Sequence, residues 1–192
     1  MITEQLKIER KEAKGFEPLP ENVYQVEVFD INLESRPTFD TRNKPDEEKI
    51  FEKVLNFQFV LLTGIDKDGK SLRGRSIWQN FVPTYLYIGK NGKNTLYQIS
   101  EAVLRHQLTQ EEEAYMDAEV INGYVGNQLR VVVKHKKSGE KTYSNIESFL
   151  AVDELKTPLT SKEKEEATVK PKEDKETQEA KELQEALDEI TI

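Results

Sequence analysis

The chain has 192 residues, of which 36% are hydrophobic and 33% charged, so it can form one domain of ordinary size with extensions but not two large ones. It contains no cysteine, which excludes a disulfide framework and a thiolate nucleophile. The net charge of −8 argues against a uniformly basic nucleic-acid binder, although screening beyond about 8–10 Å leaves a local basic surface effective. No apolar run approaches the roughly 20 residues of a membrane span, and the polar amino-terminal stretch is unlike a secretory signal. We therefore expect a soluble, cytoplasmic protein.

Alternating apolar residues predict three strands in the first half of the chain. After a polar arm, residues 1–18, the stretch Val23–Leu33 forms the first strand, and its apolar residues change phase midway, which requires a bulge or a bend. Glu34–Lys49 is a long polar loop of the kind that is often functional or mobile. Ile50–Thr63 has apolar residues on both faces, which indicates a buried strand. An Asp-Gly turn then leads to the third strand, Leu72–Phe81.

Helical signals follow the third strand. Thr95 with Gln98, and Thr109 with Glu112, have the spacing of capping boxes, so a helix is expected to begin at each threonine. The glutamates at 111–113 complement the dipole of such a helix and project in different directions, which argues against a metal cluster. Asn122–Phe149 then predicts a β-hairpin that closes the folded part.

Two segments are basic although the chain as a whole is acidic. Residues 64–93 contain six basic and two acidic residues, and Asn122–Glu147 contains five basic and two acidic ones. Basic groups interleaved with aromatic side chains can bind a polyanion that also offers flat bases, whereas a lysine-rich hairpin tip is usually only solvated. The candidate nucleic-acid-binding residues are Arg73, Arg75, Trp78, Tyr85, Tyr87, Arg130, Lys134, Lys136, Lys137, Lys141 and Tyr143.

These candidates imply a geometric expectation. If they form a groove, Arg73, Arg75, Lys134 and Lys136 line one concave face together with an exposed aromatic ring. Trp78 lies on a strand whose two faces are both mixed, so a core position and a stacking position remain open alternatives.

No catalytic constellation is visible in the sequence. His106 and His135 lie on different elements without acidic residues at ligand spacing, which argues against metal binding. There is no nucleophile elbow, glycine-rich phosphate loop or histidine dyad. We therefore expect a protein that is not an enzyme and that needs no cofactor and no metal.

The C-terminal segment, residues 154–192, is rich in lysine and glutamate. From Lys156 onward seven lysines stand against eleven acidic residues, so this segment carries half of the net charge. Such a segment cannot bury enough apolar surface to offset its ordering entropy. We expect a disordered or helical acidic tail after a domain that covers residues 19–153. Leu183, Leu187 and Ile190 could form a weak amphipathic stripe near the end.

The order of elements predicts the fold class. Five strands with a helical block between the third and fourth is the order of an OB-fold barrel. We therefore predict a mainly β protein, a five-stranded OB-fold barrel with a helical insertion between strands 3 and 4.

Three places in the sequence share a pattern with a known family. Leu19–Tyr24 has a proline, a short turn and a tyrosine before the first strand, and Gly74–Phe81 has a glycine-arginine pair, an aromatic and an asparagine-phenylalanine pair. Asn122–Val133 followed by Asn145–Phe149 has the pattern of the closing hairpin. Over about Leu19–Val152 the chain resembles the single-stranded DNA-binding proteins of bacteriophages and related mobile elements, although its long second loop departs from the shortest members.

The resemblance implies binding and protection of single-stranded DNA, with little sequence preference, in phage-like DNA replication or recombination. It places the protein in the host cytoplasm if it is viral. The acidic-hydrophobic end of the tail resembles a docking tip for replication or recombination proteins. It could also compete with DNA for the basic groove. The alternative is that the tail only keeps the protein in solution. Two further alternatives are a β-barrel protein-interaction or structural module that binds no nucleic acid and an RNA-binding OB-fold.

Overall fold

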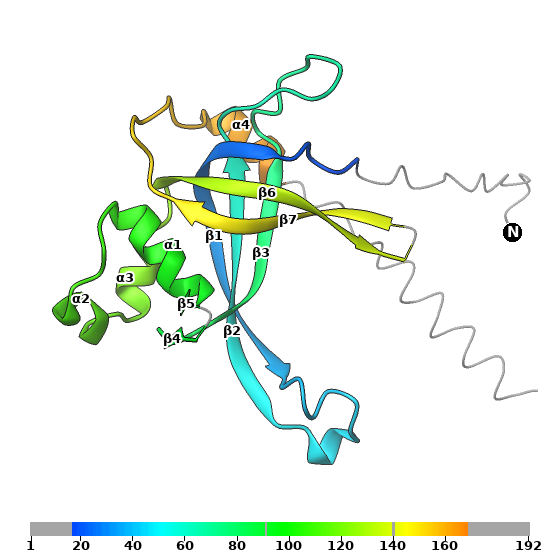
Figure 1. Ribbon diagram of the computed structural model, residues 1–192, viewed down its shortest axis with the longest axis vertical. Helices are drawn as coiled ribbons and strands as arrows, with labels where there is room; N and C mark the ends of the chain where they lie inside the picture. Colours follow the sequence, from blue (N-terminus) through cyan, green and yellow to red (C-terminus); the bar gives the residue numbers. More distant parts are fainter. Residues whose placement is uncertain (1–16, 91, 140, 169–192) are drawn as a thin grey trace, which may run out of the picture.

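The computed structural model describes residues 17–90, 92–139 and 141–168. The predictions for residues 1–16 and for residues 169–192, including the apolar stripe near the end, lie outside these described residues. Figure 1 shows a curved sheet with a group of short helices (green) at the left, another short helix (orange) at the top, and two long hairpins that extend away from the centre of the sheet.

Five antiparallel strands form the sheet, which confirms the prediction of a mainly β fold. In chain order they are β1 (Asn22–Pro37), β2 (Phe51–Leu61), β3 (Ser76–Pro83), β6 (Gln128–Ser138) and β7 (Lys141–Leu150). Their order in the sheet is β3-β2-β1-β6-β7. In the described part of the chain β3 and β7 are not paired, so the sheet is not a closed barrel.

The first strand contains the predicted bulge, but it does not change its buried face. The register between β1 and β2 shifts between Val28 and Asp30, which is a β-bulge at Phe29. Val28 lies in the main core, whereas Phe29 packs against a second cluster on the opposite face. Because of the bulge, Ile31 packs against the same main core as Val28, so the strand keeps one buried face although its apolar residues change phase.

The main core lies between the inner face of the sheet and α1 (Thr95–Leu104). Phe59 of β2 stacks on Phe57 and also meets Phe149 of β7, with ring centroids 5.9 Å apart in each pair. Because β2 and β7 are not neighbours in the sheet, this contact requires the sheet to curl. Helix α1 contacts β3, β6 and β7, so it covers the side on which the two edge strands approach each other.

Helices form at both predicted places, but only one of the two predicted capping boxes is present: α1 begins at Thr95 as predicted, without a capping box there. Asn94, not Thr95, caps α1, because its side chain accepts a hydrogen bond from the Tyr97 N–H at 3.1 Å. Thr109 and Glu112 form the predicted capping box of α2 (Gln110–Ala114). The remaining short elements are η1 (Asp46–Glu48), β4 (Ile88–Gly89), β5 (Gly92–Lys93) and α3 (Ala118–Asn122).

The turn after β2 contains a glycine that the fold requires. Gly64 has a φ of +117°, and a Cβ at this position would lie 2.6 Å from Cε1 of the buried Tyr24 ring. Gly64→Ala should therefore lower the free energy of unfolding by about 2 kcal/mol or more, from backbone strain and overpacking together. Gly69→Ala is the matched control, because Gly69 has a φ of +79° but nothing within 4 Å, so only strain of about 1 kcal/mol is expected. Equal effects in urea denaturation would contradict the role of Tyr24.

The C-terminal segment differs from the prediction. The folded part does not end near residue 153, because residues 154–168 pack on the outer face of the sheet and end in α4 (Ser161–Thr168). Leu159 and Ala167 are buried against Val60 and Leu62 of the β2 region. Two apolar side chains are enough to hold this charged segment on the fold because the sheet presents an apolar site for them. The composition of the segment alone does not reveal that site.

Buried polar groups of the sheet also hold this segment. Glu27 is 1% exposed, pairs with Lys164 at 2.9 Å and accepts a hydrogen bond from the Leu159 N–H. The Gln128 side chain bonds both the N–H and the carbonyl of Lys156. Removing the segment would take away both partners of Glu27 and both bonds between Gln128 and Lys156, and would leave Gln128 with the hydrogen bond from Gln25.

Candidate nucleic-acid interface

The β6–β7 hairpin arranges its basic side chains in an ordered pattern. The strand register pairs Lys136 with Tyr143 and Ser138 with Lys141. Residues directly opposite each other in antiparallel strands, and residues two apart along one strand, project from the same face. Lys134, Lys136, Lys141 and Tyr143 therefore share one face, which we call the basic hairpin face.

The basic hairpin face is on the outer side of the sheet and is open to solvent. Val133 is buried in the core, so alternation places Lys134 on the outer side. Tyr143 is 50% exposed, and none of the three lysines forms an ion pair within the described ranges. Lys137 projects from the opposite face, because it pairs with Thr142.

Trp78 occupies the outer face of β3 and is not a core residue. It pairs with Gln58, while its neighbour Ile77 pairs with Phe59 and belongs to the core. The Trp78 side chain is half-buried. Gln58 donates a hydrogen bond to the Ala167 carbonyl, so the end of α4 lies close to this part of the outer face.

Arg73 is an anchor of the C-terminal segment and lies in the turn before β3, not on the strand. Its Nε donates to Glu163 at 2.7 Å, and its Nη2 donates to the carbonyls of Thr157 and Pro158 at 3.0 and 2.9 Å. These bonds use the guanidinium within the fold. That Arg73 also lines a groove with the hairpin lysines stays a prediction.

The Arg73–Glu163 contact predicts a pH response of α4. Hydrogen bonds from Arg73, and then from the backbone and hydroxyl of Thr160, lower the pKa of Glu163 to about 2 from the ordinary 4.5. A carboxyl with a depressed pKa stabilises the docked state above its unfolded pKa, and this contribution disappears as the pH falls from 4.5 toward 2. Amide-exchange protection of α4 should therefore decrease in that range. Glu163→Gln should lack this step and give low protection throughout, whereas an unchanged step in that variant would contradict the assignment.

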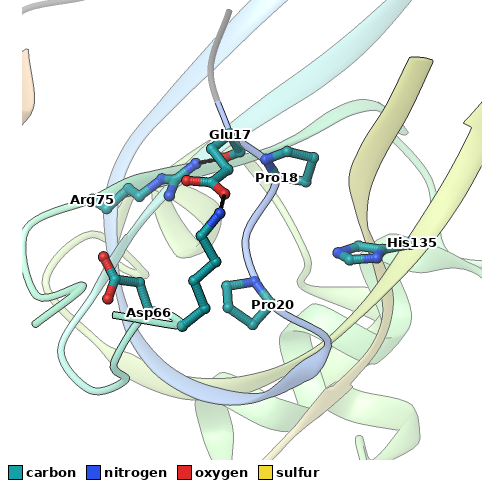
Figure 2. A pocket seen from close by; sticks show the side chains of 7 residues that line it. Glu17, Pro18, Pro20, Asp66, Arg75 and His135 are labelled. Carbon is teal, nitrogen blue, oxygen red and sulfur yellow. Dashed lines mark hydrogen bonds and ion pairs between the residues drawn. The ribbon is translucent and has the colours of Figure 1, made fainter. Parts of the chain in front are cut away.

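Arg75 lies at a pocket between the start of β3 and the hairpin. The pocket has a volume of about 310 Å³ and is lined by Glu17, Pro18, Pro20, Asp66, Lys67, Arg75 and His135. Figure 2 shows Arg75 on one side of the two prolines and His135 on the other. Arg75 donates to the Glu17 carbonyl, and His135 bonds the Leu19 carbonyl at 2.8 Å. The segment 17–20 therefore bridges the β3 side and the hairpin side of the sheet.

The last predicted arginine, Arg130, also has partners within the fold. It lies on the outer face of β6, forms an ion pair with Asp153 at 2.8 Å and donates to the Ala151 carbonyl at 2.9 Å. Its contacts fix the chain where β7 passes into the C-terminal segment.

Tyr85 and Tyr87 follow β3 and are largely exposed. A Cβ at Gly89 would lie 2.6 Å from Cε1 of Tyr87, so the Tyr87 ring packs directly over that glycine. The carbonyls of both tyrosines accept hydrogen bonds from Asn94, the residue that caps α1. The two rings are thus held beside the start of α1 and are not part of the basic hairpin face.

The predicted groove is therefore only partly assembled. Lys134, Lys136, Lys141 and Tyr143 come together, whereas the three arginines serve contacts within the fold. Sequence reasoning also missed Phe81, which is 52% exposed at the end of β3 with a φ of 61°. No local signal identifies it, because its position depends on an irregular pairing between β2 and β3.

Outside the basic hairpin face, the titratable pair His106 and Glu112 lies in the helical part of the chain. His106 bonds Glu112 at 2.7 Å, and this hydrogen bond raises the pKa of the imidazole. Across the described residues no group of three or more metal-ligating side chains is placed to hold an ion. In the same part of the chain, none of the helices has the length and apolar character needed to cross a bilayer.

The comparisons with known proteins give no family for this chain. No protein-family model matches it, and no curated protein matches it either.

Proposed function

We propose that the protein binds single-stranded DNA with little sequence preference and without catalysis. The observation that carries the proposal is the basic hairpin face, where three exposed lysines surround the half-exposed ring of Tyr143. Lysines can follow a phosphate backbone, and an aromatic ring can stack on any base, contributing about 1–3 kcal/mol per base. A surface built from these two groups favours a single strand because its bases are accessible.

The sheet order supports an OB-type arrangement as the scaffold. Strand order β3-β2-β1-β6-β7, with α1 between the third and fourth long strands, is the order expected if an OB barrel is opened between β3 and β7. The bridge made by residues 17–20 between these two edges is consistent with such a barrel. OB-folds bind oligonucleotides on the face of strands 2 and 3, between the loop joining strands 1 and 2 and the loop joining strands 4 and 5.

This scaffold gives the ligand a proposed path. Residues 154–168 cover the outer face of β2 at Val60, so the strand would follow the outer face of β3 and the part of β2 that this segment leaves uncovered. The β1–β2 loop would lie at one end of this path and the tip of the β6–β7 hairpin at the other. Figure 1 shows the two hairpins extending in different directions, with β3 running between their bases. Trp78 lies on this outer face and the basic hairpin face supplies the cations.

The biological setting rests on the resemblance to phage proteins. We propose that the protein coats and protects single strands during phage-like DNA replication or recombination. Residues 169–192 would then dock replication or recombination proteins. Both proposals depend on DNA binding being observed first.

A second candidate function is a protein-interaction module that binds no nucleic acid. It is favoured by the use of Arg73 and Arg130 within the fold and by exposed apolar side chains on the β1–β2 hairpin. These side chains are Leu33, Phe39, Ile50 and Phe51.

A direct titration separates the two functions. Fluorescent oligo-dT and a duplex of equal length are titrated with the full chain at low and at moderate salt, and anisotropy is measured. Tight binding to oligo-dT, weaker binding to duplex and a steep loss of affinity with salt are expected. Equal binding to duplex would reduce the interaction to general electrostatics, and no binding to oligo-dT at low salt would favour the second candidate.

A further inference from the structure

Phe81 has a backbone conformation that a phenylalanine rarely adopts. Its φ is 61°, the left-handed region that disfavours residues with a Cβ. The register between β2 and β3 shifts here, so that Asn80 and Phe81 both lie opposite Asn56. The Phe81 N–H donates to Oδ1 of Asn56 at 3.0 Å, which holds the bulge in place. Strain of this kind persists where the surrounding structure enforces it, and it is concentrated at functional sites.

The ring of Phe81 gains little stabilisation from burial in the main core. It is 52% exposed and does not belong to the main core, although the next residue, Val82, does. The guanidinium of Arg36 lies over it, with Cζ 4.2 Å from the ring centroid. Two hydrogen bonds from Arg36 to Oε1 of Glu52, at 3.1 and 3.0 Å, hold that guanidinium in position. The ring is thus presented to solvent with its position fixed from one side.

Phe81 shares the outer face with Trp78. Arg36 pairs with Glu52, and Trp78 pairs with Gln58. Glu52 and Gln58 are an even number of residues apart on β2, where the alternation is unbroken, so they project from the same face. Two aromatic side chains therefore follow one another along the outer face of β3.

The charges around Phe81 indicate what would bind there. Glu34 accepts a hydrogen bond from Asn56, the residue opposite Phe81, and Glu52 holds Arg36. Carboxylates beside the ring oppose a phosphate, so an uncharged planar group is the better occupant. An unpaired base has this chemistry, and its phosphates would lie away from the ring.

We propose that Phe81, positioned by Arg36, is a base-stacking residue at the end of β3 in the path of a single strand. The proposal rests on the proposed function, because it assigns a subsite to the same ligand. The strained backbone is the cost of presenting the ring, so the fold should not need phenylalanine at this position.

Substitutions at this position separate stacking from folding. Phe81→Asn removes the ring and tolerates positive φ, so its thermal midpoint should equal or exceed that of the wild type. Phe81→Leu removes the aromatic ring but still requires a residue with a Cβ to adopt a positive φ. Phe81→Tyr keeps an aromatic ring that can stack on a base. Tyr115→Ala is the matched control, because Tyr115 is an exposed aromatic (71%) next to the short helix α2. Each variant is titrated with oligo-dT and with an abasic oligomer of the same length.

The outcomes distinguish this subsite from the function itself. Phe81→Asn and Phe81→Leu should weaken oligo-dT binding about tenfold and leave abasic binding unchanged, while Phe81→Tyr and Tyr115→Ala bind as the wild type does. Wild-type affinity for oligo-dT in both loss variants would overturn the subsite and leave the function standing. An equal loss for oligo-dT and the abasic oligomer would also overturn it. A wild-type protein that does not bind oligo-dT at low salt would overturn the function and the subsite together.

Discussion

Replacing Lys134, Lys136 and Lys141 together by glutamine should weaken oligo-dT binding about 100-fold at ~0.1 M salt. Each phosphate contact on a single strand contributes about 0.7 to the slope of log affinity against log salt, so three lost contacts reduce the slope by about 2. The difference from wild type should therefore shrink toward zero near ~1 M salt. Anisotropy titrations at several salt concentrations measure both quantities.

The control for this variant is a second triple variant in which three lysines at other positions are replaced by glutamine. Lys70, Lys90 and Lys156 are exposed and belong neither to the basic hairpin face nor to α4, and their replacement by glutamine removes the same total charge. Only a small, general loss of affinity is expected. If the two triple variants lose affinity equally, the hairpin has no special role and net charge alone governs binding.

A chain that ends at Asp153 should be less stable than the full chain by about 3 kcal/mol. It loses the burial of Leu159 and Ala167, the partners of buried Glu27, and the two hydrogen bonds between Gln128 and Lys156. Burying a side chain as large as leucine contributes about 1.5–3 kcal/mol, and each hydrogen bond adds about 1 kcal/mol before the ordering entropy is subtracted. Urea denaturation followed by the tryptophan signal measures the difference.

Two variants test whether docking of the segment is the cause. A chain that ends at Thr168 keeps every contact described here and should unfold as the full chain does. Leu159→Ala removes one apolar anchor and should cost about 2 kcal/mol. A chain ending at Asp153 that is as stable as the one ending at Thr168 would show that residues 154–168 do not stabilise the fold.

The sequence predicts those elements that depend on local pattern. Alternation predicted the strands, and the change of phase in β1 predicted the bulge at Phe29, which returns Ile31 to the core face. The capping box at Thr109 is likewise a local signal. The hairpin was found for the same reason, and its register brings Lys134, Lys136 and Lys141 together once the strands pair.

The roles of the arginines could not be predicted from local pattern. Arg73, Arg75 and Arg130 contribute to basic segments of the sequence, yet each bonds a group that is distant in the chain or follows the hairpin. A count of charges does not reveal such partners. The docking of residues 154–168 escaped prediction for a related reason, because their composition resembles a solvated tail while the apolar site that receives them lies on β1 and β2.

The fluorescence of Trp78, the single tryptophan, reports most directly whether a single strand follows the outer face of β3. Trp78 lies on the outer face of β3, so a single strand that follows the proposed path should quench or shift its fluorescence. Oligo-dT added at low salt should give a saturable change that salt reverses, and polyphosphate at equal charge should give none. Binding of oligo-dT, seen by anisotropy, that leaves the Trp78 emission unchanged would contradict the proposed path. No binding at all would contradict the account as a whole.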